Sequence, residues 1–176
     1  MKKIILYIAA SLDQRIAEPD GSLEWLTGVP SPQKTNGEYK DLLASVDTVL
    51  IGGRAYRELL SMEVIWPYKE QMTYVVSRHN WGDEDNIRFI TDNVIETISA
   101  LRNDEGKDIL LVGGGKLISM LLTADLIDEM QITYIPVILG EGIPLFPKQP
   151  KESKWELVEN IAHKSDALTI KYRKRS

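Results

Sequence analysis

Three short stretches of the sequence combine glycine or a hydroxyl group with a basic side chain. They are Gly52-Gly53-Arg54, Ser77-Arg78 and Gly113-Gly114-Gly115-Lys116. Glycine lets a ligand reach the backbone without meeting a Cβ atom, and a neighbouring cation adds attraction for an anion. A serine hydroxyl beside an arginine can likewise bind a phosphate. Together, these residue types in this order predict binding of phosphate groups.

Both glycine stretches stand between an apolar run and a helical pattern, in "VLIGGRAYRELL" and "ILLVGGGKLISMLL". A helix N-terminus has free N–H groups and a partial positive charge, and ligands of α/β sheets bind at the carboxyl ends of strands. Two such junctions in one small domain predict a diphosphate or a ligand with two anionic ends, and a dinucleotide fits. Neither stretch matches G-x-x-x-x-G-K-S/T or G-x-G-x-x-G, so a tight turn without a ligand remains the alternative for each.

The elements that would position these residues alternate between strands and helices. Apolar runs predict strands over residues 3–10, 46–51, 72–77, 86–90, 109–112 and the later part of 126–139. Three- and four-residue spacing predicts helices over residues 37–45, 54–62, 93–103 and 116–124. Residues 155–174 read as an antiparallel hairpin that turns at 164–167, whereas 11–26 and 140–147 read as loops, with a short helix after Ser22. We therefore predict one three-layer α/β domain over residues 1–176, with a mostly parallel central sheet and the hairpin at one edge.

The composition narrows the class of function. The net charge of −5 argues against a general nucleic-acid binder. The chain has no cysteine and only two histidines, far apart in sequence, which argues against disulfides, a zinc site and a Ser-His-Asp triad. We expect no metal. No apolar run approaches the length of a membrane span, and the N-terminal run lacks a typical cleavage site, so we expect a cytoplasmic protein.

Several motifs together resemble one known family along nearly the whole chain. They are "SLDQRIA", "VDTVLIGGRAYREL", "VVSR", "LLVGGGKLISMLL" and "LIDEMQITYIPVILGEGIPLF". The sequence resembles the dihydrofolate reductase fold, and within it the branch that contains the reductase domain of bacterial riboflavin biosynthesis, the RibD C-terminal domain. The last motif is the most diagnostic of that branch.

The resemblance implies an NADPH-dependent reductase. Gly53, Arg54 and Ala55 would meet the cofactor phosphates, and Ser77 and Arg78 would lie on its adenosine side. The segment that would wrap the diphosphate and the nicotinamide ribose comprises Gly113, Gly114, Gly115, Lys116, Leu117 and Ile118. Similar proteins have a cis peptide between the first two glycines of the triple, here Gly113 and Gly114.

The substrate would lie over the nicotinamide, beside the loop after the first strand, the helix at 37–45 and the strand "QITYIP". Asp13 and Glu38 are the candidate catalytic carboxylates. The pterin-binding carboxylate of dihydrofolate reductase falls near Gly37, so Glu38 either replaces it or faces solvent. Asp13 either contacts substrate or caps a turn, and Gln14 stands where the family has glycine.

Two further residues are candidates for the substrate side. Trp25 is either a pocket wall or part of the core, and Thr133 is either the substrate-side threonine of the family or an ordinary strand residue. His163, in the predicted hairpin, carries no evident chemistry.

The leading substrate by resemblance is 5-amino-6-(5-phosphoribosylamino)uracil. Dihydrofolate reduction, nucleotide binding without turnover, and flavin binding remain alternatives. We also expect a homodimer, because the terminal hairpin would expose a strand edge to pairing.

Overall fold

The computed structural model describes residues 1–26, 37–62, 65–147 and 152–176. Its strands are β1 Ile4–Ser11, β2 Arg15–Ala17, β3 Val46–Gly52, β4 Met72–Val76, β5 Ile87–Ile90, β6 Asp108–Gly113, β7 Glu129–Ile135, β8 Ile143–Pro144, β9 Trp155–Ala162 and β10 Leu168–Lys174. Its helices are the 3₁₀ turn η1 Glu24–Leu26 and the α-helices α2 Gly37–Ala44, α3 Gly53–Ser61, α4 Val94–Asn103 and α5 Gly115–Thr123.

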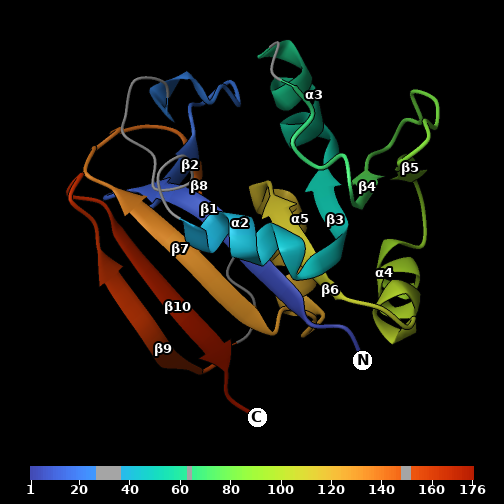
Figure 1. Cartoon of the computed structure of the whole chain (residues 1–176). Coiled ribbons are helices and arrows are strands. Elements are labelled where there is room, and N and C mark those ends of the chain that lie inside the picture. Colours follow the sequence, from blue (N-terminus) through green and yellow to red (C-terminus); the bar gives the residue numbers. More distant parts are fainter. Residues whose placement is uncertain (27–36, 63–64, 148–151) are drawn as a thin grey trace.

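The main sheet has the strand order β5-β4-β3-β6-β1-β7-β10-β9. Its first six strands pair in parallel, while β10 runs antiparallel to both β7 and β9. The terminal hairpin therefore forms one edge of the sheet and β5 the other (Figure 1). This arrangement confirms the predicted three-layer α/β fold with a mostly parallel sheet and an antiparallel hairpin.

Strand β1 is central because its apolar run is buried on both faces. Leu6 pairs with Leu111 of β6 on one side and with Met130 of β7 on the other. Ile4 and Leu6 are fully buried. A continuous apolar run is what a strand covered on both faces requires.

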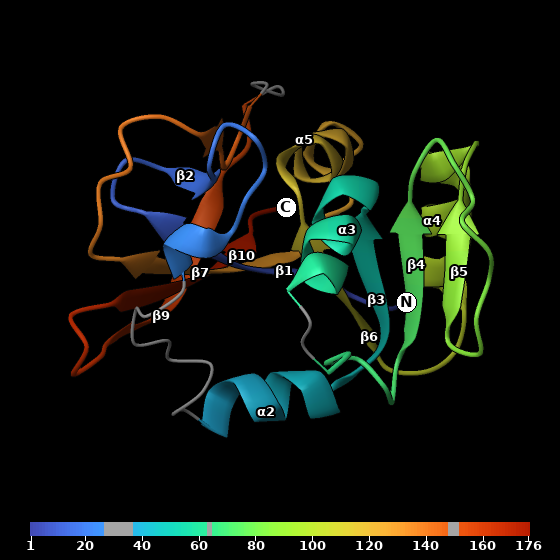
Figure 2. The same cartoon turned by 90° about the horizontal axis from the view of Figure 1, so that it is seen from above.

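Two helical layers cover the sheet. Ile98 of α4 and Leu121 of α5 are fully buried in one cluster with Ile4, Leu6 and other strand residues. On the opposite face, α2 packs against Tyr7 and its neighbours, and α3 packs against Ile51 and its neighbours. Figure 2 shows α2 and α5 on opposite sides of the sheet.

The prediction of loops at residues 11–26 and 140–147 was wrong in part. Strand β2 pairs there with the two-residue strand β8, and Arg15 Nη1 donates a hydrogen bond to the Gly142 carbonyl at 3.2 Å. Strands this short have no visible periodicity, and their partners are more than a hundred residues apart. The helix expected after Ser22 is the single 3₁₀ turn η1. No helix among the described residues has the length and apolar character to cross a bilayer.

Candidate active site

The three phosphate-binding stretches predicted from sequence meet at one edge of the sheet. Strands β4, β3 and β6 are parallel neighbours, so their carboxyl ends lie together (Figure 1). A Cβ atom on Gly52 would lie 3.3 Å from the Gly114 nitrogen, and one on Gly53 would lie 3.0 Å from Ser77 Oγ. We call this surface, formed by residues 52–54, 77–78 and 113–116, the glycine edge.

Two helices begin at the glycine edge. Gly52 and Gly114 are the extended N-cap residues of α3 and α5, and neither helix has a side-chain cap. The first-turn N–H groups are therefore available to an anion. The peptide between Gly113 and Gly114 is cis, as the family resemblance predicts. A Cβ atom on Gly114 would have no described heavy atom within 4 Å beyond its chain neighbours, so this backbone faces open space.

Three cationic side chains surround the glycine edge. Arg54, Arg78 and Lys116 are all exposed. Arg54 leans toward the loop after β2, because a Cβ atom on Gly21 would lie 2.5 Å from Arg54 Nε. The half-buried Ser77 hydroxyl accepts a hydrogen bond from the His79 N–H at 3.1 Å. The glycine edge therefore carries exposed positive charge that favours an anion.

The other three predicted cofactor residues lie deeper. Ala55 of α3 is half-buried, while Leu117 and Ile118 of α5 belong to the core. The Ile118 N–H already donates to the Gly114 carbonyl at 3.0 Å. These side chains anchor the two helix starts, and the polar groups of the edge come from their neighbours.

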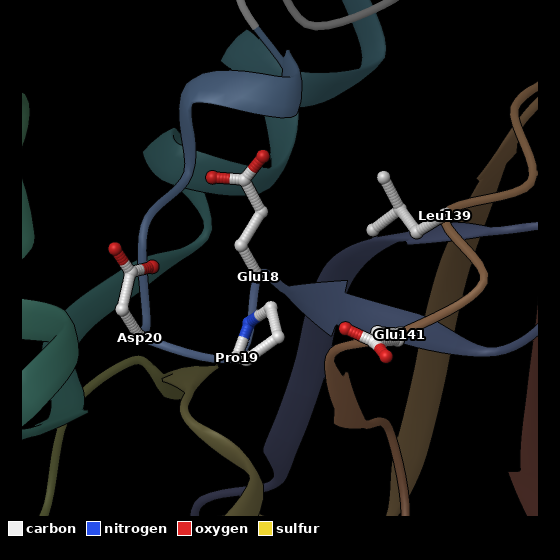
Figure 3. Close-up of a pocket in the computed structure, with 5 residues that line it drawn as sticks. All are labelled: Glu18, Pro19, Asp20, Leu139 and Glu141. Atoms are coloured by element: carbon white, nitrogen blue, oxygen red, sulfur yellow. The ribbon is translucent and has the colours of Figure 1, made fainter.

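A hollow of about 360 Å³ lies between the loop after β2 and the loop after β7. Glu18, Pro19, Asp20, Leu139 and Glu141 line it (Figure 3). Three carboxylates around one hollow repel phosphate. The anionic part of a ligand therefore belongs at the glycine edge and not in this hollow.

Asp13 joins the loop after β1 to the loop after β7. Its carboxylate accepts hydrogen bonds from Ser11 Oγ at 2.5 Å, from the Leu139 N–H at 3.1 Å and from the Gly140 N–H at 2.8 Å. The Ser11 hydroxyl, followed by these backbone N–H groups, lowers the pKa of Asp13 to about 2 against the opposing effect of desolvation. Since the group is ionised at neutral pH, this geometry favours the turn-anchoring role over that of a proton donor.

Gln14 adopts a backbone conformation that favours glycine. Its φ is 66°, in the left-handed region, and its side chain accepts a hydrogen bond from the Tyr134 hydroxyl at 3.0 Å. The side chain of Gln14 therefore links this turn to β7.

The remaining candidates differ in what surrounds them. The Trp25 indole N–H donates to the Ile16 carbonyl at 3.3 Å, which ties η1 to β2. Glu38 lies in the first turn of α2, but the structure does not describe its side chain. Whether it faces the substrate stays a prediction.

Thr133 lies on the face of the sheet that α2 covers. It pairs with Ala9 of β1, two residues along from Tyr7, and the Tyr7 ring lies 5.0 Å from that of Tyr39 in α2. Residues two apart in a strand share a face, so Thr133 lies on the same face of the sheet as Tyr7 and α2. Thr133 Oγ1 also bonds Thr169 Oγ1 at 2.9 Å, and Thr169 Oγ1 bonds His163 Nε2 at 2.8 Å.

The sequence did not indicate that Thr169 and His163 are hydrogen-bonded to the candidate residue Thr133 as one chain. Neither belongs to a motif, and only the strand register brings Thr169 opposite Thr133. The described residues contain no group of three or more His, Asp or Glu side chains placed to hold a metal ion.

Comparisons with known proteins give one matching family model and several relatives. The family model of the RibD C-terminal domain matches residues 2–169. The uncharacterized protein YwjB of Bacillus subtilis is 37% identical, with 89% of each chain covered. The riboflavin biosynthesis protein RibD of Corynebacterium ammoniagenes is 25% identical over 80% of this chain, which spans only 44% of that protein.

Solved structures give the same relationship. A protein of Shewanella sp. PV-4 assigned to riboflavin biosynthesis has a TM-score of 0.86 at 30% identity, with 99% of each chain covered. The Thermotoga maritima deaminase and 5-amino-6-(5-phosphoribosylamino)uracil reductase has a TM-score of 0.72 at 17% identity, over 99% of this chain and 57% of that one. Dihydrofolate reductase of Enterococcus faecalis, complexed with NADP(H), has a TM-score of 0.70 at 18% identity, over 99% and 97%. These last two show the shared fold.

Proposed function

Because the chain belongs to the RibD C-terminal domain family, we propose that it is an NADPH-dependent reductase of a small heterocycle. The leading substrate is 5-amino-6-(5-phosphoribosylamino)uracil, whose ribose would be reduced to a ribityl chain. The proposal goes beyond the family assignment in naming the cofactor, the substrate and turnover.

One observation carries the proposal: the glycine edge is continuous across β4, β3 and β6. Gly52 lies against Gly114, and Gly53 lies against Ser77, so one bound ligand would meet both helix starts and the serine hydroxyl. The open space at Gly114 admits a diphosphate close to the backbone. The exposed Arg54, Arg78 and Lys116 supply the opposite charge.

The residues of the chain would bind and orient both reactants. NADPH supplies the hydride when bound, and the protein holds donor and acceptor in register. First-turn N–H groups of α3 and α5 would hold the diphosphate, while Ser77 and Arg78 would hold the 2′-phosphate. Trp25, Thr133 and α2 would border the heterocycle. The anchored Asp13 would hold the two flanking loops together.

Two measurements test this proposal in sequence. Titration calorimetry with NADPH and NADH should give tighter binding of NADPH, by about tenfold or more, because only NADPH carries the 2′-phosphate. Loss of the reduced-nicotinamide absorbance is then followed with the aminouracil substrate or with dihydrofolate. Oxidation with the first supports the proposal, and oxidation only with the second assigns dihydrofolate reduction instead. Binding without oxidation would indicate a nucleotide-binding protein, and no binding of either coenzyme would overturn the cofactor assignment.

We also propose that two copies of the chain pair along β9. This strand forms the edge of the sheet, and Leu157 and Val158 on it are about half exposed. An eight-residue edge strand with apolar side chains favours pairing with another strand. Sedimentation equilibrium should give twice the chain mass, and Val158→Lys should give the mass of one chain. A single-chain mass for the unsubstituted protein at micromolar concentration would reject the dimer.

A further inference from the structure

Three hydrogen-bonded side chains connect the turn of the terminal hairpin to the face of the sheet that α2 covers. His163 Nε2 bonds Thr169 Oγ1 at 2.8 Å, and Thr169 Oγ1 bonds Thr133 Oγ1 at 2.9 Å. Thr169 is 2% exposed and Thr133 is 3% exposed, whereas His163 is half-buried beside the turn. We call this set the hydroxyl chain. It links a titratable group near solvent with two buried hydroxyls.

The chain has two possible directions, because each hydroxyl has one hydrogen to donate. When His163 Nε2 carries no hydrogen, it accepts from Thr169, and Thr169 accepts from Thr133. Thr133 then uses its hydrogen within the chain and has only lone pairs left for a ligand on this face of the sheet.

The order reverses when Nε2 carries a hydrogen, as it does in the imidazolium and in one of the two neutral tautomers. His163 Nε2–H then donates to Thr169, and the Thr169 hydrogen passes to the Thr133 oxygen as a hydrogen bond. The Thr133 hydrogen becomes available to a ligand. Because both threonines are buried, leaving a hydroxyl unpaired is costly, which holds the chain in one direction or the other.

The hairpin backbone holds the histidine in place. The His163 N–H donates to the Ala167 carbonyl at 2.9 Å, and the Asp166 N–H donates to the His163 carbonyl at 3.0 Å. The charged side chains of the hairpin are Lys164 and Asp166 in the turn, Glu156 on β9, Arg173 and Lys174 on β10, and the strand pair Glu159 and Lys171. The last two pair with each other at 3.1 Å.

We propose that His163 is a positioning residue that sets, through Thr169, whether Thr133 offers a hydrogen-bond donor or an acceptor to the substrate. The proposal rests on the proposed function, since Thr133 and α2 are the expected border of the substrate site. Protonated His163 favours a heterocycle that presents a carbonyl oxygen or a bare ring nitrogen to Thr133. Protonation always makes Nε2 a donor, whereas the neutral ring with its hydrogen on Nδ1 makes Nε2 an acceptor, so the preference depends on pH.

The first test needs no turnover. The chain has two histidines, so ¹⁵N–¹H spectra of the imidazoles can follow both titrations once each is assigned with His163→Gln and His79→Gln. Thr133→Val should move the titration midpoint of His163 by about 0.5 pH unit, roughly half of what one hydrogen bond contributes, although Thr133 bonds Thr169 and not the ring. The His79 midpoint should stay unchanged. Thr169→Ser retains a hydroxyl and should restore most of the behaviour that Thr169→Val removes.

The second test is the pH dependence of KM for 5-amino-6-(5-phosphoribosylamino)uracil at saturating NADPH. As pH rises through the His163 midpoint, KM should increase about fivefold, the effect of losing one hydrogen bond, while the Kd of NADPH stays constant. His163→Gln should abolish this rise, and the control His79→Gln should retain it.

A KM profile that is the same in His163→Gln as in the unsubstituted protein would overturn the inference, even if NADPH is oxidised normally. An unmoved His163 midpoint in Thr133→Val would overturn it as well. If the protein oxidises no NADPH, the proposed function fails, and the spectra alone decide whether the hydroxyl chain couples Thr133 to His163.

Discussion

Substituting Gly114 by alanine separates cofactor binding from folding. The added Cβ would meet no described heavy atom within 4 Å beyond its chain neighbours, and the residue has a φ of −84°, which alanine accepts. We therefore expect the free energy of unfolding to change by no more than about 1 kcal/mol, the range of Gly→Ala substitutions at compatible positions. A diphosphate held on the first turn of α5 would meet that methyl group. We expect the Kd of NADPH to rise at least about tenfold, which corresponds to about 1.4 kcal/mol.

Gly115→Ala is the matched control, one residue further along. Its Cβ would lie 3.0 Å from Pro147 Cγ and 3.1 Å from the Pro144 carbonyl oxygen. Overpacking at such a site costs about 1–3 kcal/mol, so this substitution should lower the stability of the fold. Gly114→Ala should therefore weaken NADPH binding, whereas Gly115→Ala should lower the stability of the fold.

The assay combines urea unfolding with titration calorimetry of NADPH for both variants. The reasoning is refuted if Gly114→Ala binds NADPH as tightly as the unsubstituted protein while remaining folded. That result would mean that no ligand approaches the backbone at Gly114, and the glycines would then serve only the turn.

Three further predictions concern single side chains. Asp13→Asn should weaken the fold at neutral pH, because the lowered pKa of Asp13, about 2, makes its carboxylate stabilising above about pH 4. This contribution disappears as the pH falls toward 2, so urea midpoints of the two proteins should converge in acid, and a constant difference would contradict the prediction. Arg78→Ala should weaken NADPH binding about tenfold and leave NADH unaffected in calorimetry, whereas equal losses would remove Arg78 from the 2′-phosphate site. Leu121→Ala should cost about 2–5 kcal/mol in urea unfolding because Leu121 is fully buried, and Met120→Ala, 39% exposed, should cost far less.

Much of the fold follows from local pattern. Apolar runs mark β1, β3 and β6 as buried strands, and three- and four-residue spacing marks α3 and α5. A strand covered on both faces needs apolar side chains on both, whereas a helix at the surface needs them on one face only. The paired strand-glycine-helix junctions predicted a phosphate-binding edge, and the strand order brings those junctions into contact.

The sequence by itself determined the longer strands and the α-helices, and which of their ends carry glycine and positive charge. The tertiary structure alone decided which distant groups meet. Asp13 reaches Gly140, β2 pairs with β8, and Thr133 bonds Thr169. These contacts depend on strand register and loop paths, which the whole core sets when it packs, and no local repeat in the chain encodes them.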